Sequence, residues 1–206
     1  MATAPPRTLL LDVMDTLVRE PWFEDAPTFF GMSLDDLYAI KHPRSWIDFE
    51  HGRITEAEYF RTFFADGRAL DGPAFVAHLR RGYRFLPGIE PLLTDLAATG
   101  IPMHALSNYP VWWEHIESDL RLSRFLDWSF VSCITGERKP DPAAYTIPLA
   151  RLGAQPTDCL FVDDREENIV AAEAVGIPGV LFTGAADLRR ELTTRGVLPG
   201  VQDGAP

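Results

Sequence analysis

The sequence contains few cysteines and no long apolar or basic runs, and each scarcity excludes a class of protein. Two cysteines in 206 residues cannot make a disulfide framework, and no cysteine or histidine spacing matches a metal-ligand motif. No run is rich in lysine and arginine, and the formal net charge is −11, so nucleic acids and anionic membrane surfaces are not expected partners. No apolar run approaches the length of a transmembrane helix.

A secretion signal is also missing from the sequence. Residues 1–7 lack the charged-then-apolar pattern of a signal peptide, so we expect a cytoplasmic location. Cys133 and Cys159 each lie in an apolar, strand-like run, which favours free thiols in a reducing compartment. With 46% hydrophobic residues the chain can bury a sizeable core, and we expect a monomer or a homodimer.

The stretch Thr8–Leu17 is typical of a buried parallel strand that ends at a carboxylate. The apolar run Leu9–Leu11 is too short for a typical helix, and polar, turn-prone residues follow Asp12. In open α/β sheets, ligands bind outside the carboxyl ends of the strands, so Asp12 is expected in such a crevice. The alternative is an aspartate that only caps the next turn.

Residues 19–86 have a different character from the rest of the chain, because they are rich in aromatic residues and carry helix signals. Ser33 is a candidate N-cap, residues 55–58 form a capping box, and Asp71 with Pro73 begins another helix. We therefore expect residues 19–86 to form a small all-helical insert. Most of its aromatic side chains are expected to pack its own core.

From Pro87 onward, apolar strand-like runs alternate with helical patterns. Strands are expected at 102–106, within 126–133, at 159–162 and at 178–182, with helices between them. This alternation predicts an α/β fold with a doubly wound parallel sheet, formed by residues 1–18 and 87–206.

Polar or charged side chains follow four successive strands of this predicted sheet. Because parallel strands end at one edge, we expect these side chains to converge. Three clustered carboxylates repel one another unless a cation joins them, and oxygen ligands favour Mg²⁺. A carboxylate at such a site can also attack phosphorus, while a lysine neutralises the crowded charge. The residues are Asp12, Ser107, Asn108, Lys139, Asp163 and Asp164.

The four segments together resemble the motifs of the haloacid dehalogenase-like (HAD) hydrolase superfamily. They are residues 11–17, 105–108, 139–142 and 161–168, and the resemblance covers nearly the whole chain. The helical insert resembles the small C1-type cap of that family, which closes over the active site. The resemblance implies a Mg²⁺-dependent hydrolase that acts on a small phosphorylated metabolite.

The resemblance also implies roles for individual residues. Asp12 would be the nucleophile, and Ser107, Asn108 and Lys139 would bind the phosphate. Asn168 would support either the metal loop or Lys139. The Mg²⁺ ligands would be Asp12, the backbone carbonyl of Met14, Asp164 and, close by or ligating, Asp163.

One position departs from the family pattern. Phosphatases of this family usually carry an acid two residues after the nucleophile, to protonate the leaving group, and here that residue is Met14. Loss of a general acid costs about 10²–10⁴-fold in rate. Asp15 is a candidate replacement, although its side chain could instead stabilise the turn.

Met14 keeps two other functions open. Metal-free 2-haloacid dehalogenases of the same superfamily also lack the acid, because a halide leaves without a proton. These dehalogenases do not need an acidic pair after the fourth strand. The presence of Asp163 and Asp164 therefore favours phosphoryl transfer. A non-catalytic protein that binds a phosphorylated metabolite is the third hypothesis.

A narrower resemblance is to the plant plastid flavin mononucleotide (FMN) hydrolases, which share the methionine after the nucleophile. It is carried by residues 12–16, 29–32, 41–43, 46–50 and 107–110. It implies a flavin phosphate as substrate. Aromatic residues of the insert and nearby could then stack on the flavin ring, and the candidates are Trp22, Phe23, Trp46 and Tyr109.

Overall fold

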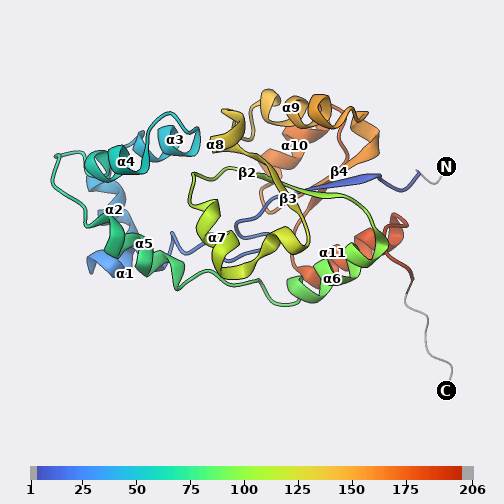
Figure 1. Cartoon of the computed structure of the whole chain (residues 1–206), viewed down its shortest axis with the longest axis horizontal. Coiled ribbons are helices and arrows are strands. Elements are labelled where there is room, and N and C mark those ends of the chain that lie inside the picture. The colour runs from blue at the N-terminus through green and yellow to red at the C-terminus, as the bar shows by residue number, and fades with distance from the viewer. Residues whose placement is uncertain (1–3, 201–206) are drawn as a thin grey trace, which may run out of the picture.

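A five-stranded parallel sheet forms the centre of the computed structural model, which describes residues 4–200 (Figure 1). The strand order is β3-β2-β1-β4-β5, so the first strand of the chain is the middle strand of the sheet. This confirms the predicted doubly wound α/β fold. The strands are β1 (Thr8–Leu11), β2 (Met103–Ser107), β3 (Asp127–Val131), β4 (Cys159–Asp163) and β5 (Gly179–Leu181).

Helices cover both faces of the sheet (Figure 1). Their packing follows the alternation of side chains along each strand. Leu10 packs with Phe161 in the core beneath α9 and α10, whereas Leu9 and Leu11 face the larger core that contains residues of α6, α7 and α11. These helices are α6 (Ile89–Thr99), α7 (Trp113–Leu120), α9 (Pro142–Leu152), α10 (Glu166–Ala174) and α11 (Ala185–Thr194).

Residues 19–86 contain five short helices, which Figure 1 shows grouped at one end of the molecule. Three of them begin at the residues that the sequence indicates. Ser33 Oγ accepts a hydrogen bond from Asp36 N, Thr55 and Glu58 form a complete capping box, and Asp71 caps Ala74 N. The helices are α1 (Asp25–Phe30), α2 (Leu34–Ile40), α3 (Ser45–Glu50), α4 (Glu56–Thr62) and α5 (Gly72–Arg80).

The third strand is shorter than the apolar run that predicted it. The chain leaves the sheet at Val131 and turns through the short helix α8 (Ser132–Thr135), so Cys133 lies on a helix and not on a strand. Ser132 Oγ explains the change, because it donates to Glu50 O at 2.6 Å and accepts from Tyr109 N at 3.0 Å. This hydroxyl ties the sheet to the helical segment 19–86. Both cysteines are free thiols.

Two single turns of 3₁₀ helix complete the described elements: η1 (Leu122–Arg124), before β3, and η2 (Pro156–Asp158), before β4. Within residues 4–200, every helix is too short or too polar to cross a lipid bilayer.

Candidate active site

Two buried aspartates lie side by side because β1 and β4 are neighbours. Leu11 pairs with Val162 at the ends of these strands, and Asp12 N donates to Val162 O at 2.9 Å. Asp12 is 7% exposed and Asp163 is fully buried. The strand ladder therefore holds both carboxylates at the carboxyl edge of the sheet, as the sequence predicts.

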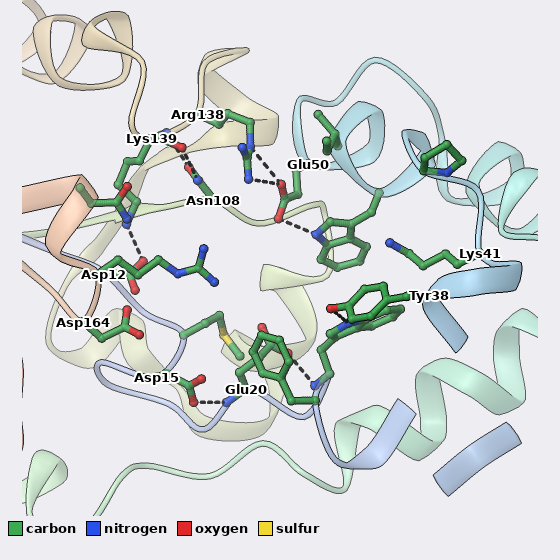
Figure 2. Close-up of a pocket in the computed structure, with 18 residues that line it drawn as sticks. Asp12, Asp15, Glu20, Tyr38, Lys41, Glu50, Asn108, Arg138, Lys139 and Asp164 are labelled. Atoms are coloured by element: carbon green, nitrogen blue, oxygen red, sulfur yellow. Dashed lines mark hydrogen bonds and ion pairs between the residues drawn. The ribbon is translucent and has the colours of Figure 1, made fainter. Parts of the chain in front are cut away.

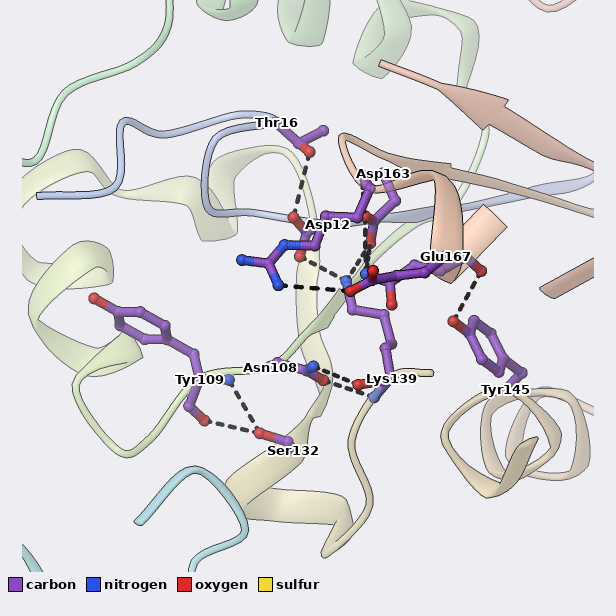
Figure 3. Close-up of polar contacts among 11 residues, drawn as sticks. Asp12, Thr16, Asn108, Tyr109, Ser132, Lys139, Tyr145, Asp163 and Glu167 are labelled. Atoms are coloured by element: carbon purple, nitrogen blue, oxygen red, sulfur yellow. Dashed lines mark hydrogen bonds and ion pairs between the residues drawn. The ribbon is translucent and has the colours of Figure 1, made fainter. Parts of the chain in front are cut away.

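Lys139 is delivered to these carboxylates by the loop between α8 and α9. Its Nζ donates to Asp12 Oδ1 at 2.7 Å and to Asp163 Oδ2 at 2.5 Å, and the side chain is 2% exposed (Figure 3). The side chain of Asn108 fixes the loop, since its Oδ1 accepts from Lys139 N at 2.7 Å and its Nδ2 donates to Lys139 O at 2.8 Å. Asn108 thus positions Lys139, and direct binding of substrate by its side chain stays a prediction.

Burial and crowding govern the charges at this site. Burial raises the pKa of Asp12 and the nearby Asp163 raises it further, whereas the Lys139 ammonium lowers it, and the pKa rises overall to about 7. Burial opposes the charge on Lys139, but Asp12 and Asp163 outweigh it, so the pKa of Lys139 is raised. Burial and Asp163 raise the pKa of Asp164 as well. A further cation would relieve these carboxylates.

Three carboxylates have the placement and chemistry that fit a divalent metal ion. Asp12, Asp163 and Asp164 offer oxygen atoms that all lie within 4.8 Å of one another. Asp163 is already engaged, because it accepts from Lys139, from Asn168 Nδ2 at 2.9 and 3.0 Å, and from Arg165 N at 2.8 Å. Asp12 and Asp164 line the open cavity and are the better placed ligands. An all-oxygen set of this kind fits Mg²⁺.

Ser107, at the end of β2, is 2% exposed, and its buried Oγ has no hydrogen-bond partner among the described residues. A buried hydroxyl without a partner is costly unless a ligand supplies one. The predicted contact with a phosphate oxygen would satisfy it.

The turn after Asp12 holds the two residues whose roles the sequence leaves open. Met14 and Asp15 both line the cavity and are half-buried. Asp15 has a left-handed backbone (φ 54°), and its Oδ1 accepts from Glu20 N at 2.9 Å. This hydrogen bond supports the turn-stabilising interpretation of Asp15, while its role as an acid stays a prediction.

A cavity of about 300 Å³ connects the carboxylates to the helical segment (Figure 2). Figure 2 shows Asp12 and Asp164 on one side of it and Tyr38 and Lys41 on the other. We call these the carboxylate end and the aromatic end. The aromatic end is lined by Trp22, Phe23, Tyr38, Lys41, Pro43, Trp46, Ile47 and Glu50, the last of which accepts a hydrogen bond from Trp46.

Trp46 and Trp22 belong to the aromatic end, as the sequence suggests, but both also serve the packing. Their rings stack at 5.7 Å, and Trp46 Nε1 donates to Glu50 Oε1 at 2.6 Å. Tyr109, another stacking candidate, does not line the cavity, because its ring is 3% exposed and its hydroxyl pairs with Tyr83 Oη at 2.8 Å.

Five charged residues of the cavity were not among the predicted site residues: Glu20, Lys41, Glu50, Arg138 and Arg165. Burial raises the pKa of Glu20 to about 8 and also raises that of Glu50, which Arg138 Nε contacts at 3.1 Å. Arg138 directly precedes Lys139, and Lys41 and Glu50 lie in segments that carry the narrower resemblance. The narrower resemblance was therefore the one sequence feature that could have marked Lys41 and Glu50 as site residues. It does not indicate that their side chains face the cavity.

Comparison with known proteins places the chain in a family. Residues 7–176 match the family of haloacid dehalogenase-like hydrolases, and the chain belongs to it. It is 46% identical over 189 residues to flavin mononucleotide hydrolase 1, a chloroplastic protein of Arabidopsis thaliana, covering 92% of this chain and 77% of that protein. Both the family and the narrower resemblance are therefore confirmed.

Solved structures share the fold at low sequence identity. One is a HAD-family enzyme of Bacteroides thetaiotaomicron in complex with magnesium and inorganic phosphate (TM-score 0.67, 19% identity, covering 85% of this chain and 93% of that one). Another is the L-2-haloacid dehalogenase of Xanthobacter autotrophicus (TM-score 0.61, 17% identity, 94% and 85% covered). Because both kinds of hydrolase share the fold, the chemistry has to be argued from the site.

Proposed function

We propose that the chain is a Mg²⁺-dependent phosphomonoester hydrolase in which Asp12 is the nucleophile. One observation carries the proposal: the Asp12 carboxylate lies at a cavity wall beside Asp164, with the buried Lys139 ammonium 2.7 Å from its Oδ1. The arrangement combines a nucleophile, a cation site and a fixed positive charge. All three serve phosphoryl transfer.

In the first step Asp12 attacks phosphorus, the bond from phosphorus to the ester oxygen breaks, and an aspartyl-phosphate forms while the released oxygen takes up a proton from Asp15 or from water. Water then attacks phosphorus, which releases inorganic phosphate and regenerates the carboxylate. Lys139 offsets the negative charge on the transferring group, and Ser107 donates to a phosphoryl oxygen. A magnesium ion, held by Asp12, Asp164 and the Met14 carbonyl with Asp163 close by, would supply further positive charge there.

FMN is the substrate that we propose. The 46% identity to an FMN hydrolase supports it, as does the aromatic end of the cavity, which offers Trp22, Phe23 and Trp46 to a flat ring. The relative is named as chloroplastic, so the cytoplasmic location of this chain stays a prediction.

We also propose that residues 19–86 are a cap over a core formed by residues 1–18 and 87–206. Residues 22–50 of this segment supply the aromatic end of the cavity, and the core supplies the carboxylate end. Such an arrangement excludes bulk water from the reacting group and lets the cap select the substrate.

The decisive experiment measures phosphate release from a panel of phosphomonoesters that includes FMN, with MgCl₂ and with EDTA. We expect turnover with Mg²⁺ only, and a loss of at least about 10⁴-fold in Asp12→Asn, as is usual when a nucleophile is removed. Exposed Asp66→Asn is the matched control and should behave as wild type.

Two results would replace the proposal by one of the alternatives. Release of halide from a 2-haloacid in EDTA, without action on phosphate esters, would identify a metal-free dehalogenase. Thermal stabilisation by phosphorylated metabolites without any turnover would identify a binding protein. In that case Met14→Asp should create phosphatase activity.

A further inference from the structure

Lys41 is a partly buried cation that has no role in the proposed reaction. The sequence has only two lysines, and the other is Lys139 in the carboxylate end. Lys41 follows α2 and lines the opposite end of the same cavity, as Figure 2 shows. Its backbone is fixed, because Lys41 N donates to Leu37 O and the flanking His42 N donates to Phe63 O at 2.7 Å.

Aromatic rings, and no carboxylate, hold the Lys41 ammonium. Its Nζ lies 5.0 Å from the centre of the Trp22 ring and 5.8 Å from that of Tyr38, which is the geometry of a cation–π contact. Across residues 4–200 no carboxylate oxygen lies within 4.0 Å of it. Burial lowers the pKa of Lys41, and Glu50 is the charged group that partly offsets this effect. The other three cations that line the cavity, Arg138, Lys139 and Arg165, each have a carboxylate oxygen within 4.0 Å.

Three apolar side chains of the aromatic end are open to solvent. Phe23 is 44% exposed, Tyr38 46% and Ile47 37%, and all three line this cavity. The Trp22 ring, which contacts the Lys41 ammonium, is positioned by two interactions. It stacks on Trp46, and its Nε1 donates a 3.0 Å hydrogen bond to Tyr38 Oη. The aromatic end therefore presents to a ligand apolar side chains and one cation that has no carboxylate partner within residues 4–200.

We propose that Lys41 determines substrate specificity by binding the acceptor-rich edge of a flat aromatic group at the far end of the substrate. The partners of its ammonium would be carbonyl oxygens or ring nitrogens of that group, while the phosphate lies at Asp12 and Lys139. The substrate class is a phosphomonoester whose aromatic head carries acceptors remote from the phosphate, as an isoalloxazine does. This inference rests on the proposed function and adds a residue to it.

A binding experiment tests the inference without catalysis. Riboflavin carries the flavin head and no phosphate, so its fluorescence is titrated with protein in EDTA. Lys41→Met keeps an apolar stem and should weaken riboflavin binding about tenfold, which is the size expected for a lost charge-assisted hydrogen bond. Lys41→Arg should retain most of the affinity. Arg44→Met, which removes a 70% exposed cap charge outside the cavity, should leave it unchanged.

Kinetics then separate recognition from folding. For Lys41→Met, kcat/KM for FMN should fall about tenfold through KM, whereas kcat/KM for phenyl phosphate, which has no remote acceptor, should stay within twofold of wild type. Equal loss on both substrates, or riboflavin affinity equal to that of wild type, would overturn the inference.

The two proposals fail in different ways. If wild type hydrolyses no phosphate ester, the proposed function is wrong, and riboflavin titration still decides the role of Lys41. If wild type hydrolyses phosphate esters but does not bind riboflavin, the role of Lys41 is wrong and the phosphatase stands.

Discussion

The two ends of the cavity are built in different ways. The carboxylate end is made by strand ends, where the β1–β4 ladder and the Asn108 amide fix Asp12, Asp163 and Lys139. The aromatic end is made by side chains of short helices and of the turns beside them, which pack on one another, with Trp22 in the turn before α1 and Trp46 on α3. Backbone hydrogen bonds therefore position the proposed catalytic residues. Side-chain packing shapes the aromatic end, which we propose selects the substrate.

The two ends of the cavity also differ in how their charged side chains are paired. At the carboxylate end, the buried Lys139 ammonium lies between two aspartates and offsets part of their charge. At the aromatic end, Glu50 is paired with a partly solvated Arg138, whereas the Lys41 ammonium lies over aromatic rings with no carboxylate oxygen within 4.0 Å among residues 4–200. Loss of one charge should accordingly be more damaging at the first end.

The largest effect is expected from Lys139→Met. Removing one partner of a buried ion pair leaves an uncompensated charge and costs about 3–5 kcal/mol of unfolding free energy. Arg138→Met is the matched variant at the other end and should cost clearly less, because Trp46 still donates to Glu50. Urea unfolding in EDTA at pH 8 measures both, and equal losses would contradict the comparison. The Lys139→Met deficit should shrink toward pH 5, because Asp12, whose pKa is raised by burial to about 7, takes up a proton there.

Magnesium should stabilise the folded protein only by binding at the carboxylate end. At a Mg²⁺ concentration 100 times its Kd, wild type should gain about 2.7 kcal/mol of stability. Asp164→Asn removes a ligand that faces the cavity and should abolish most of this gain, whereas Glu50→Gln, at the aromatic end, should keep it. Thermal melts with and without MgCl₂ provide the test, and an undiminished gain in Asp164→Asn would exclude this aspartate as a ligand.

A smaller effect is expected from Trp46→Phe at the aromatic end. The phenyl ring retains much of the packing but loses the 2.6 Å hydrogen bond to Glu50, which costs about 1–2 kcal/mol. Trp113→Phe is the control, since Trp113 lies outside the cavity. Urea unfolding of both variants at pH 7 gives the difference, and a Trp46→Phe protein as stable as wild type would show that this hydrogen bond is dispensable.

The smallest effect concerns Glu20 and depends on pH. Its pKa is raised by burial to about 8, so the folded protein binds a proton that the unfolded chain releases near pH 4.5. Wild type should therefore lose stability as the pH rises from 5 to 8. Glu20→Gln removes this loss and should be the more stable protein at pH 8.5 in EDTA, and not at pH 5. Because Glu20 is only half-buried, solvent screening limits the expected gain to on the order of 1 kcal/mol. Exposed Glu173→Gln should show no such pH dependence.

Sequence was enough to predict the carboxylate end. An apolar run followed by an aspartate places Asp12 and Asp163 without knowledge of the tertiary structure, because parallel strands share one edge. Lys139 and Ser107 follow from the same rule. The ends of the buried strands β1 and β4 were also predicted accurately from the sequence.

The aromatic end could not be predicted in the same way. Helices α1 and α3 lack a side-chain N-cap bond, so no local signal marks where they begin. Which aromatic residues line the cavity depends on how these helices pack, and Tyr109 is buried for that reason while Tyr38 is open. Glu20 carries no motif, and the resemblance that includes Lys41 does not say where its side chain lies, so only the packed structure shows both at the cavity wall.

The most direct measurement of the central claim is chemical trapping of the intermediate. Protein turning over FMN with Mg²⁺ is quenched with borohydride, which reduces an acyl phosphate to the alcohol, and the peptides are analysed by mass spectrometry. We predict homoserine at position 12, dependent on substrate and absent in EDTA. Rapid release of phosphate with an unmodified Asp12, or trapping at a different carboxylate, would contradict the account.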